Sequence, residues 1–237
     1  MEQMDKHRQE DFVQNLFSSI SRKYDLLNAI FTLNQDAYWR NFAASKANVK
    51  EGCSILDVCC GTGKLSIPLA KLAGPCGQIT GLDFSESMLL KAHENISKTP
   101  HQNITLMQGN ALHLPFTDNS FDCTTIGFGL RNVSDIEGTL AEMYRVVKPG
   151  GTVLSVELAK PNAPILKQLY YFYFEHILPL LGNLCFSKKQ PYYNLPASLK
   201  TLPHQSVIQE LFCKTGLQQV KYYSLTGGIA AVHVGIK

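Results

Sequence analysis

The sequence has few charged residues and only a small excess of positive charge, which limits the partners it can take. Charged residues make up 17% of its 237 residues, and the formal net charge is +3. No run of lysine and arginine is longer than two residues, as in the pair Lys188-Lys189. A dedicated nucleic-acid binder carries a clustered basic face, so we expect no nucleic-acid partner. At 45% hydrophobic residues, the chain is also too apolar to be disordered.

Long apolar runs and paired cysteines are also lacking. A membrane-spanning helix needs about 20 apolar residues, whereas the richest stretch, residues 169–181, contains Glu175, His176 and Pro179. The first 12 residues are polar, unlike a secretory signal. The 7 cysteines form no C-x-x-C pair, which argues against a zinc ribbon and a disulfide framework. We therefore expect a cytoplasmic protein with reduced cysteines and no metal site.

Hydrophobic periodicity predicts alternating strands and helices. The first 48 residues are helical, and Asp36 is a candidate cap for the second helix there. Short apolar runs then alternate with helical segments, which is typical of βαβ units and a mostly parallel sheet. The expected strands are residues 54–59, 78–82, 103–107, 121–126 and 152–156. After an aromatic, proline-rich stretch come a helix at 205–214 and two apolar segments joined by a Thr-Gly-Gly hairpin signal.

The most informative segment is the turn Gly61-Thr62-Gly63, which directly follows a predicted buried strand. Its glycines let the backbone approach a ligand closely, and ligands of α/β sheets bind at the carboxyl ends of strands. A dinucleotide fingerprint needs a third glycine where Ser66 stands, and a phosphate loop needs one at Val58. A pyrophosphate clamp is therefore disfavoured, and a turn that merely requires glycine stays an alternative.

Two more strand ends carry groups that suit a nucleoside. Asp83 ends the second strand, where a carboxylate can accept hydrogen bonds from ribose hydroxyls. Its alternative role is a helix cap, shared with Ser85. Asn110 and Ala111 follow the third strand, and they offer an amide for a base edge and room for a flat ring, or simply a turn. Together the three strand ends describe an adenosine site without a diphosphate, which fits S-adenosylmethionine.

Several segments resemble class I methyltransferases and, within them, the UbiE/MenG family of menaquinone and ubiquinone C-methyltransferases. They are YDLLN at 24–28, GNALHLPF at 109–116, FGLRN at 128–132, RVVKPGG at 145–151 and the chain end from residue 222. The resemblance spans essentially the whole chain. It implies an α/β, Rossmann-like class I methyltransferase fold, with a mostly parallel seven-stranded sheet, a C-terminal antiparallel hairpin and helices on both faces.

The resemblance also implies one domain over residues 1–237 with four parts. These are an N-terminal helical lid (1–48), a cofactor-binding core (49–160), an aromatic substrate-side insertion (161–203) and a C-terminal helix and hairpin (204–237). It carries cofactor contacts to Thr62, Asp83, Asn110 and Ala111, with Asp57, Gly61 and Gly63 shaping the loop. The family often has an acidic residue at Lys64, Ser at Gly127 and His at Asp36.

The activity implied is S-adenosylmethionine-dependent C-methylation of a prenylated quinol ring, with demethylmenaquinol as the first candidate. The ubiquinol precursor, another small molecule, an RNA substrate and a silent binding module stay open as alternatives. A phenol loses its proton near pH 10, so the enzyme must take that proton or hold the quinolate. We expect Arg131 to stabilise the quinolate unless it forms a structural ion pair. Tyr24 and Asp25 are candidate substrate contacts, and His233 is expected in the core.

The aromatic block of residues 170–174 is expected to form a core helix, to line a groove for the prenyl tail, or to touch a membrane surface. A prenylated quinol is held in the lipid bilayer by its apolar tail. We therefore expect the protein to act in the cytoplasm and to contact the inner face of the membrane peripherally. The sequence leaves both a monomer and a homodimer open.

Overall fold

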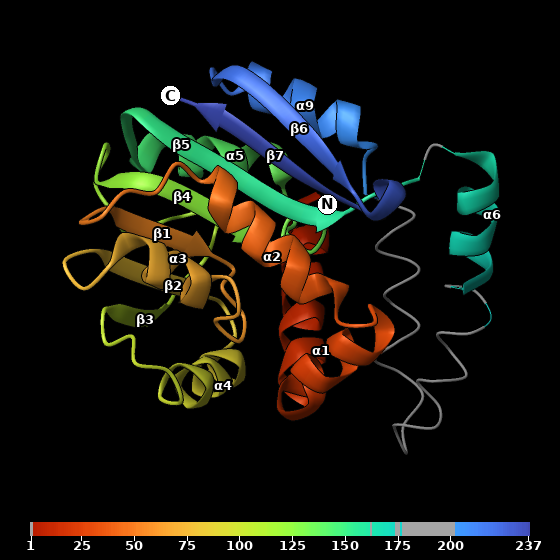
Figure 1. The fold of residues 1–237 in the computed structure, drawn as a ribbon, viewed down its shortest axis with the longest axis horizontal. Helices are drawn as coiled ribbons and strands as arrows, with labels where there is room; N and C mark the ends of the chain where they lie inside the picture. Colours follow the sequence, from red (N-terminus) through yellow and green to blue (C-terminus); the bar gives the residue numbers. More distant parts are fainter. Residues whose placement is uncertain (1, 162, 174–175, 177–201) are drawn as a thin grey trace.

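Short apolar segments of the sequence form one seven-stranded sheet in the computed structural model, which describes residues 2–161, 163–173, 176 and 202–237. The strands are β1 (Ser54–Val58), β2 (Gln78–Asp83), β3 (Ile104–Gln108), β4 (Phe121–Gly127), β5 (Val147–Leu158), β6 (Gln218–Leu225) and β7 (Ala230–Ile236). Their order across the sheet is β3-β2-β1-β4-β5-β7-β6 (Figure 1). The first strand, β1, therefore lies inside the sheet, and the later strands are added on both sides of it.

The sheet is parallel from β3 to β5 and antiparallel only at β7, which pairs with both β5 and β6. This confirms the mostly parallel sheet and the C-terminal hairpin. The turn η2 (Thr226–Gly228) joins β6 to β7, and Gly227 adopts a φ of 68°, a conformation that glycine reaches without strain. The fifth strand begins at Val147, earlier than the predicted residue 152, because the chain pairs with Phe121 across a register shift.

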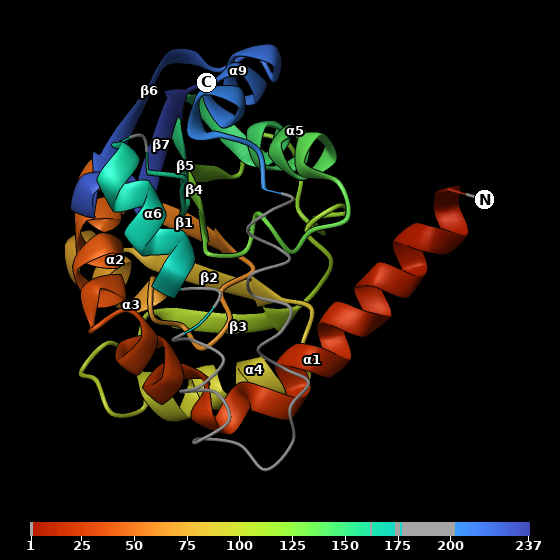
Figure 2. The same ribbon diagram turned by 90° about the vertical axis from the view of Figure 1, so that its right-hand side faces the viewer.

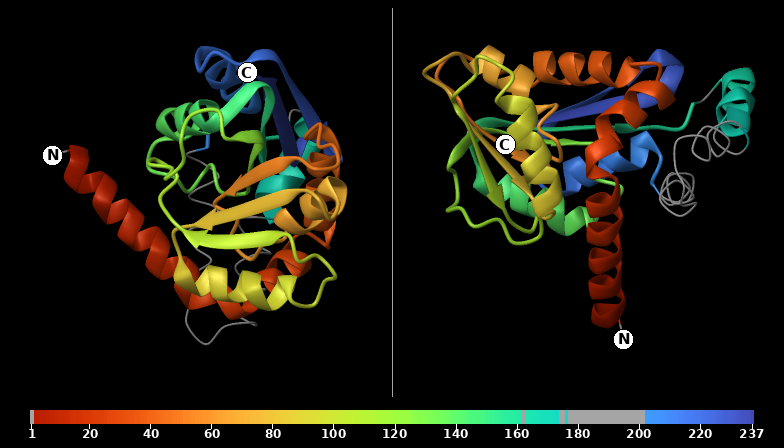
Figure 3. Two further views of the ribbon diagram at one scale, coloured as in Figure 1. Left: turned by 90° about the vertical axis from the view of Figure 1, so that its left-hand side faces the viewer. Right: turned by 90° about the horizontal axis from the view of Figure 1, so that it is seen from below.

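Helices cover both faces of the sheet, as expected. They are α1 (Glu2–Phe31), α2 (Gln35–Lys46), α3 (Ser66–Ala73), α4 (Glu86–Ile96), α5 (Ile136–Val146), α6 (Pro164–Phe172) and α9 (Gln205–Lys214). α2 and α3 lie on one face and α5 and α9 on the other (Figure 2). The first half of α1 projects away from the sheet, and its second half packs on α4 (Figure 3). None of the helices described is long and apolar enough to cross a membrane.

The N-terminal helices are attached to the sheet through Trp39, which is almost completely buried. Its ring packs near Phe128, with the ring centroids 6.2 Å apart. Its Nε1 donates a hydrogen bond of 2.8 Å to Thr226 Oγ1 in the hairpin turn. The N-terminal segment is therefore held against the end of the sheet where β4 and β5 finish. Most of the aromatic insertion lies outside the described residues, and its described part is α6.

His233 lies in β7 and is completely buried, as the sequence predicted. Its Nε2 lies 2.9 Å from the Gln205 carbonyl oxygen, and since a carbonyl oxygen can only accept, Nε2 donates this hydrogen bond. Burial lowers the pKa of His233 from 6.5 to about 4, although the hydrogen bond to Gln205 works in the opposite direction. Between about pH 4 and pH 6.5, His233 is therefore mostly unprotonated in the folded protein and mostly protonated in the unfolded chain.

This difference predicts that acid destabilises the fold through His233. As the pH falls below about 6.5, the unfolded chain binds a proton and the folded protein does not, so the free energy of unfolding decreases by about 2 kcal/mol at about pH 4.5. Urea unfolding at several pH values measures this loss. His233→Gln keeps a donor for Gln205 but cannot titrate, and its stability should vary less with pH; equal pH dependence in both proteins would contradict the assignment.

Candidate functional site

The glycine turn after β1 is fixed by the carboxylate that ends β2. Asp83 accepts hydrogen bonds from the backbone N–H of Gly61 (2.8 Å) and of Ser85 (2.9 Å). Burial raises the pKa of Asp83 above its ordinary value, and these hydrogen bonds oppose that rise. Ser85 occupies the N-cap position of α4 without a side-chain capping bond. Asp83 thus ties two loops together at the carboxyl edge of the sheet, and it also lines a cavity there.

Asp57, near the end of β1, supports the glycine turn through hydrogen bonds to neighbouring elements. Its carboxylate is fully buried and accepts hydrogen bonds from Ser66 Oγ (2.6 Å) and Thr125 Oγ1 (2.8 Å). Burial raises the pKa of Asp57 from 3.8 to about 6, while the two hydroxyl donors oppose the rise. The side chain therefore connects β1, α3 and β4, and this agrees with the loop-shaping role that the resemblance implies.

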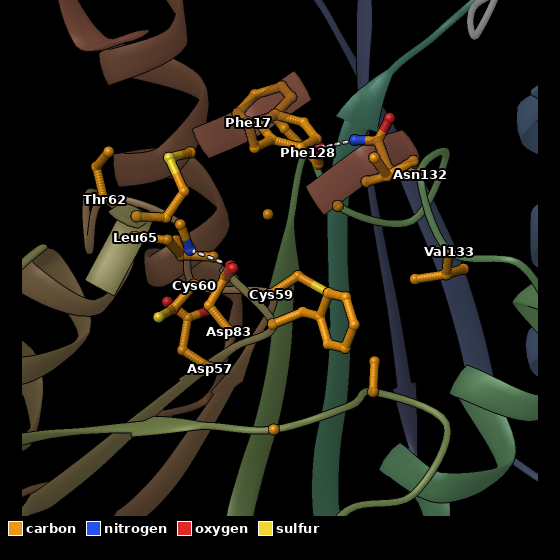
Figure 4. Close-up of a pocket in the computed structure, with 18 of the residues that line it drawn as sticks. Phe17, Asp57, Cys59, Cys60, Thr62, Leu65, Asp83, Phe128, Asn132 and Val133 are labelled. Atoms are coloured by element: carbon orange, nitrogen blue, oxygen red, sulfur yellow. Dashed lines mark hydrogen bonds between the residues drawn. The ribbon is translucent and has the colours of Figure 1, made fainter. Parts of the chain in front are cut away.

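A cavity of about 120 Å³ opens above these carboxylates. Figure 4 shows Asp57 and Asp83 near the glycine turn, with Phe17 and Phe128 across the opening. The predicted cofactor residues that line it are Asp57, Gly61, Thr62, Asp83, Asn110 and Ala111. Gly63 does not line it, and a Cβ atom there would lie 3.4 Å from Ala92 in α4. The structure therefore brings together almost all of the residues that three separate strand ends suggested.

Asn110 forms the turn that the sequence offered as one of two alternatives. Its Oδ1 accepts a hydrogen bond of 2.9 Å from the backbone N–H of Leu112, which closes a turn. The residue also lines the cavity next to buried Ala111. The turn thus holds Asn110 at the wall of the cavity.

Asp25 fastens α1 to the glycine turn. It accepts hydrogen bonds from Thr62 Oγ1 (2.6 Å) and from Asn95 Nδ2 (2.7 Å). The Nζ atom of Lys64 lies 3.9 Å from the same carboxylate and is partly exposed, so this pair adds little stability. Asp25 lines neither of the two cavities described here, whereas its neighbour Tyr24 lines both. The departure at Lys64 therefore places its side chain near Asp25 of α1.

A second cavity adjoins the first, and at about 280 Å³ it is the larger one. Three residues line both cavities: Tyr24, Arg40 and Phe128. Its other walls come from α1, α2, the end of β5, α6 and the hairpin turn, and they are mainly apolar. From the aromatic block, Tyr170 and Tyr173 line it, while Phe172 is exposed; the side chains of residues 171 and 174 lie outside the described ones. Tyr170 also belongs to the hydrophobic core, with Tyr173 packed against it, so both residues pack in the core while they line the cavity.

Two buried ion pairs border the second cavity. Arg131 pairs with Glu157, and their side chains are only 7% and 1% exposed. Arg40 pairs with Asp36 one helical turn away, and its guanidinium lies 4.9 Å from the centre of the Phe128 ring. Arg131 therefore forms the ion pair that the sequence offered as the alternative, and it also faces the cavity.

Sequence reasoning missed Arg40 and misplaced Asp36. The i,i+4 spacing of these two residues was the available signal for their pairing. Asn34 occupies the N-cap position of α2, with a left-handed φ of 61°, so the prediction of Asp36 as the cap is wrong. Asp36 lies inside the first turn of the helix, where its side chain reaches Arg40 instead of the free backbone N–H groups.

Gly127, at the end of β4, lines the first cavity where the resembling family often has Ser. A Cβ atom at this position would lie 3.0 Å from Leu65 Cδ2. Leu65 would have to move to accommodate a larger residue. The chain thus fills with Leu65 the space that a side chain at position 127 would take.

Comparisons with known proteins agree on one family and one fold. A sequence model described as the ubiE/COQ5 methyltransferase family matches residues 3–237. The chain is 44% identical over 227 residues to a demethylmenaquinone methyltransferase of Desulfitobacterium hafniense, covering 95% of this chain and 90% of that one. It is 42% identical over 233 residues to the same-named protein of Staphylococcus aureus strain Newman, covering 98% and 96%.

Solved structures with low sequence identity share the fold. A SAM-dependent methyltransferase of Aquifex aeolicus aligns with a TM-score of 0.66 at 18% identity, covering 92% of this chain and 97% of that one. A possible histamine N-methyltransferase of Thermotoga maritima aligns with a TM-score of 0.67 at 18% identity, covering 95% and 99%. The predicted class I methyltransferase fold is confirmed.

The burial of the Arg131–Glu157 pair predicts an asymmetric effect of substitution. Arg131→Met leaves Glu157 buried without its partner and should lower the free energy of unfolding by about 3–5 kcal/mol. Arg131→Met combined with Glu157→Gln removes both charges and should recover most of that loss. Chemical unfolding of the two variants measures the difference. Equal stability of the single and double variants would contradict the pairing.

Proposed function

We propose a quinol C-methyltransferase function for this chain, which belongs to the ubiE/COQ5 methyltransferase family. In this proposal it transfers a methyl group from S-adenosylmethionine to a ring carbon of demethylmenaquinol, forming menaquinol. The observation that carries the proposal is the pair of adjoining cavities, one lined by polar strand ends and the other by apolar side chains. A methyl group can be transferred only between two ligands that are in contact. The two cavities are adjacent, since three residues line both of them.

The residues of the first cavity fit S-adenosylmethionine. The Asp83 carboxylate suits the two ribose hydroxyls, because a carboxylate oxygen accepts more than the one hydrogen bond that each already has. Asn110 and Ala111 suit the adenine ring, and the glycine turn leaves space for the backbone to approach the ligand closely. When bound, this cofactor supplies an electrophilic methyl group on a sulfonium.

The quinol ring and the start of its tail fit the second cavity. Arg131 Nε is buried and has no hydrogen-bond partner among the described residues, although its Nη1 pairs with Glu157. A quinol oxygen would satisfy this donor, and the positive charge would favour the quinolate. Tyr24 lines both cavities and would contact the substrate where they meet. For Asp25, the contacts support a positioning role through Thr62.

A methyl-transfer assay with purified protein tests the function. With S-adenosylmethionine, reduced demethylmenaquinol should be methylated and the oxidised quinone should not, because only the hydroquinol ring is electron-rich; mass spectrometry identifies the product. Asp83→Ala should weaken cofactor binding at least about tenfold in calorimetry, as expected for losing hydrogen bonds to a charged group. Arg131→Met with Glu157→Gln should bind the cofactor normally but turn over slowly.

Glu94→Gln is the control, since Glu94 is an exposed carboxylate on α4 that pairs with Lys91. It should match the unmodified protein in both measurements. Absence of cofactor binding would refute the methyltransferase function itself. Cofactor binding without methylation of the quinol would refute only the substrate.

The proposal includes peripheral contact with the inner face of the membrane, through an apolar patch where α1 meets α2. The patch consists of Leu26 (62% exposed), Ile30 (37%), Leu33 (83%) and Tyr38 (52%). Leu33 also lines the second cavity, so the patch is continuous with the proposed quinol site. A lipid surface at this corner would let the prenyl tail stay in the bilayer while the ring enters the protein.

Replacing patch residues should therefore weaken membrane binding. Burying one large apolar side chain contributes about 1.5–3 kcal/mol, so Leu26→Ser with Tyr38→Ser should reduce co-sedimentation with phosphatidylglycerol vesicles at least about tenfold. Leu90→Ser is the matched control, because Leu90 is 64% exposed and belongs to α4, which contributes no residue to the patch. Equal losses in both variants, or none in either, would contradict this placement.

A further inference from the structure

The second cavity holds a carboxylate to which the proposed function gives no task. Asp36 is 8% exposed and lines the cavity from the first turn of α2. Of the described residues that line this cavity, Asp36 is the one carboxylate, and none is a histidine, cysteine or lysine. A buried charge is costly to keep, and an apolar side chain would fill the same space without that cost.

The Asp36 carboxylate is held firmly but keeps room to accept another hydrogen bond. Its Oδ1 lies 2.8 Å from Thr32 Oγ1, and its Oδ2 accepts a hydrogen bond from Arg40 Nη1. An ionised carboxylate has about four acceptor positions, so a hydroxyl in the cavity can still donate to it. The two contacts fix the orientation of Asp36, which a proton acceptor in a defined geometry requires.

A proton transfer from a quinol hydroxyl to Asp36 leaves the net charge of the cavity unchanged. The other ionisable groups that face the cavity are Tyr24 from α1, Arg40 from α2, Arg131 from the β4–β5 side, and Tyr170 and Tyr173 from the α6 region. Arg131 is already balanced by Glu157. When a quinol proton moves to Asp36, the negative charge moves to the quinol oxygen. The Arg40 guanidinium that balanced Asp36 is then close enough to balance the quinolate, so no new uncompensated charge is buried.

Arg40 also links this chemistry to the first cavity. It lines both cavities and lies over the Phe128 ring, which likewise lines both. A quinol oxygen beside the Asp36–Arg40 pair therefore places the neighbouring ring carbon toward the wall that the cavities share. Carbon methylation next to a hydroxyl needs this arrangement, because the oxygen and the reacting carbon are separated by only one ring atom.

We propose that Asp36 is the general base of the reaction, and that Arg40 positions its carboxylate and then holds the quinolate. The proposal rests on the proposed function. The O–H bond breaks, its proton goes to Asp36, and the oxygen electrons raise the electron density of the neighbouring ring carbon. That carbon forms a bond to the methyl carbon while the carbon–sulfur electron pair stays on sulfur. The ring carbon then releases its hydrogen to water as a proton, and Asp36 returns its proton to the oxygen.

Two substitutions of Asp36 test this role. Asp36→Asn keeps the size of the side chain and an oxygen for Arg40 but removes the basicity, so kcat should fall about 10²–10⁴-fold, the usual contribution of general base catalysis. The KM for the quinol, and the dissociation constants of the quinol and of S-adenosylmethionine measured by calorimetry, should change less than about threefold. Asp36→His restores a base of a different kind and should recover part of kcat.

The pH profile separates a base from a structural residue. In Asp36→His, kcat should fall at acidic pH with a midpoint near the ordinary pKa of histidine, about 6.5. The acidic limb of the unmodified protein should differ from that of Asp36→His, because a carboxylate and an imidazole are bases of different strength. Thermal unfolding of each variant is recorded in parallel, and the profile of Asp36→His is decisive if Asp36→Asn does not fold.

Near-normal kcat in folded Asp36→Asn would overturn the proposal, and so would an acidic limb that is unchanged in Asp36→His. Both results leave the proposed function standing, because they require an unmodified protein that methylates the quinol. If the unmodified protein does not methylate it, the proposed function fails first, and the role of Asp36 fails with it.

Discussion

The buried carboxylate of Asp57 is the contact on which the site depends. It accepts hydrogen bonds from Ser66 at the start of α3 and from Thr125 in β4, so it joins the strand before the glycine turn to its neighbour on one side. Asp83 joins the same turn to β2 on the other side through Gly61. Because β1 lies between β2 and β4, these two carboxylates hold the turn at the place where the sheet grows in opposite directions. Ligands of open α/β sheets bind at such a place.

The N-terminal helices supply walls to two adjoining cavities at the edge of the sheet. Asp25 accepts a hydrogen bond from Thr62 in the glycine turn, and Trp39 donates one to Thr226 in the hairpin turn, so the N-terminal helices are attached to the sheet at two places. Their inner side supplies Tyr24 and Arg40 to both cavities. The same helices carry exposed apolar residues at their outer corner. In the proposed function, this one segment would border the cofactor site, form part of the quinol site and contact the lipid surface.

Charge in the second cavity is arranged in compensated pairs. Glu157 balances Arg131, and Asp36 balances Arg40. The two pairs differ in what they offer a ligand, since Arg131 Nε is an unpartnered donor among the described residues, whereas Asp36 is an acceptor. A hydroxyl group both donates and accepts, so a quinol oxygen complements the two pairs together. An apolar cavity with this polar corner suits a molecule with a quinol head and a prenyl tail.

The sequence by itself determined those features that depend only on residues close together in the chain: the strands, the glycine turn and the polar residues at the strand ends. Continuous apolar runs predict buried parallel strands, the Gly61-Thr62-Gly63 turn follows from glycine backbone freedom, and the carboxyl ends of parallel strands necessarily meet, which brought Asp83 and Asn110 to one cavity. Only the tertiary structure decided that Asp25 faces the glycine turn, that Arg131 pairs with Glu157, and that Asp36 lines a cavity instead of capping its helix. Some of these contacts join segments that are distant in sequence, and others depend on the direction of a side chain after the helices have packed. A local pattern of residues specifies neither the long-range contacts nor the side-chain directions.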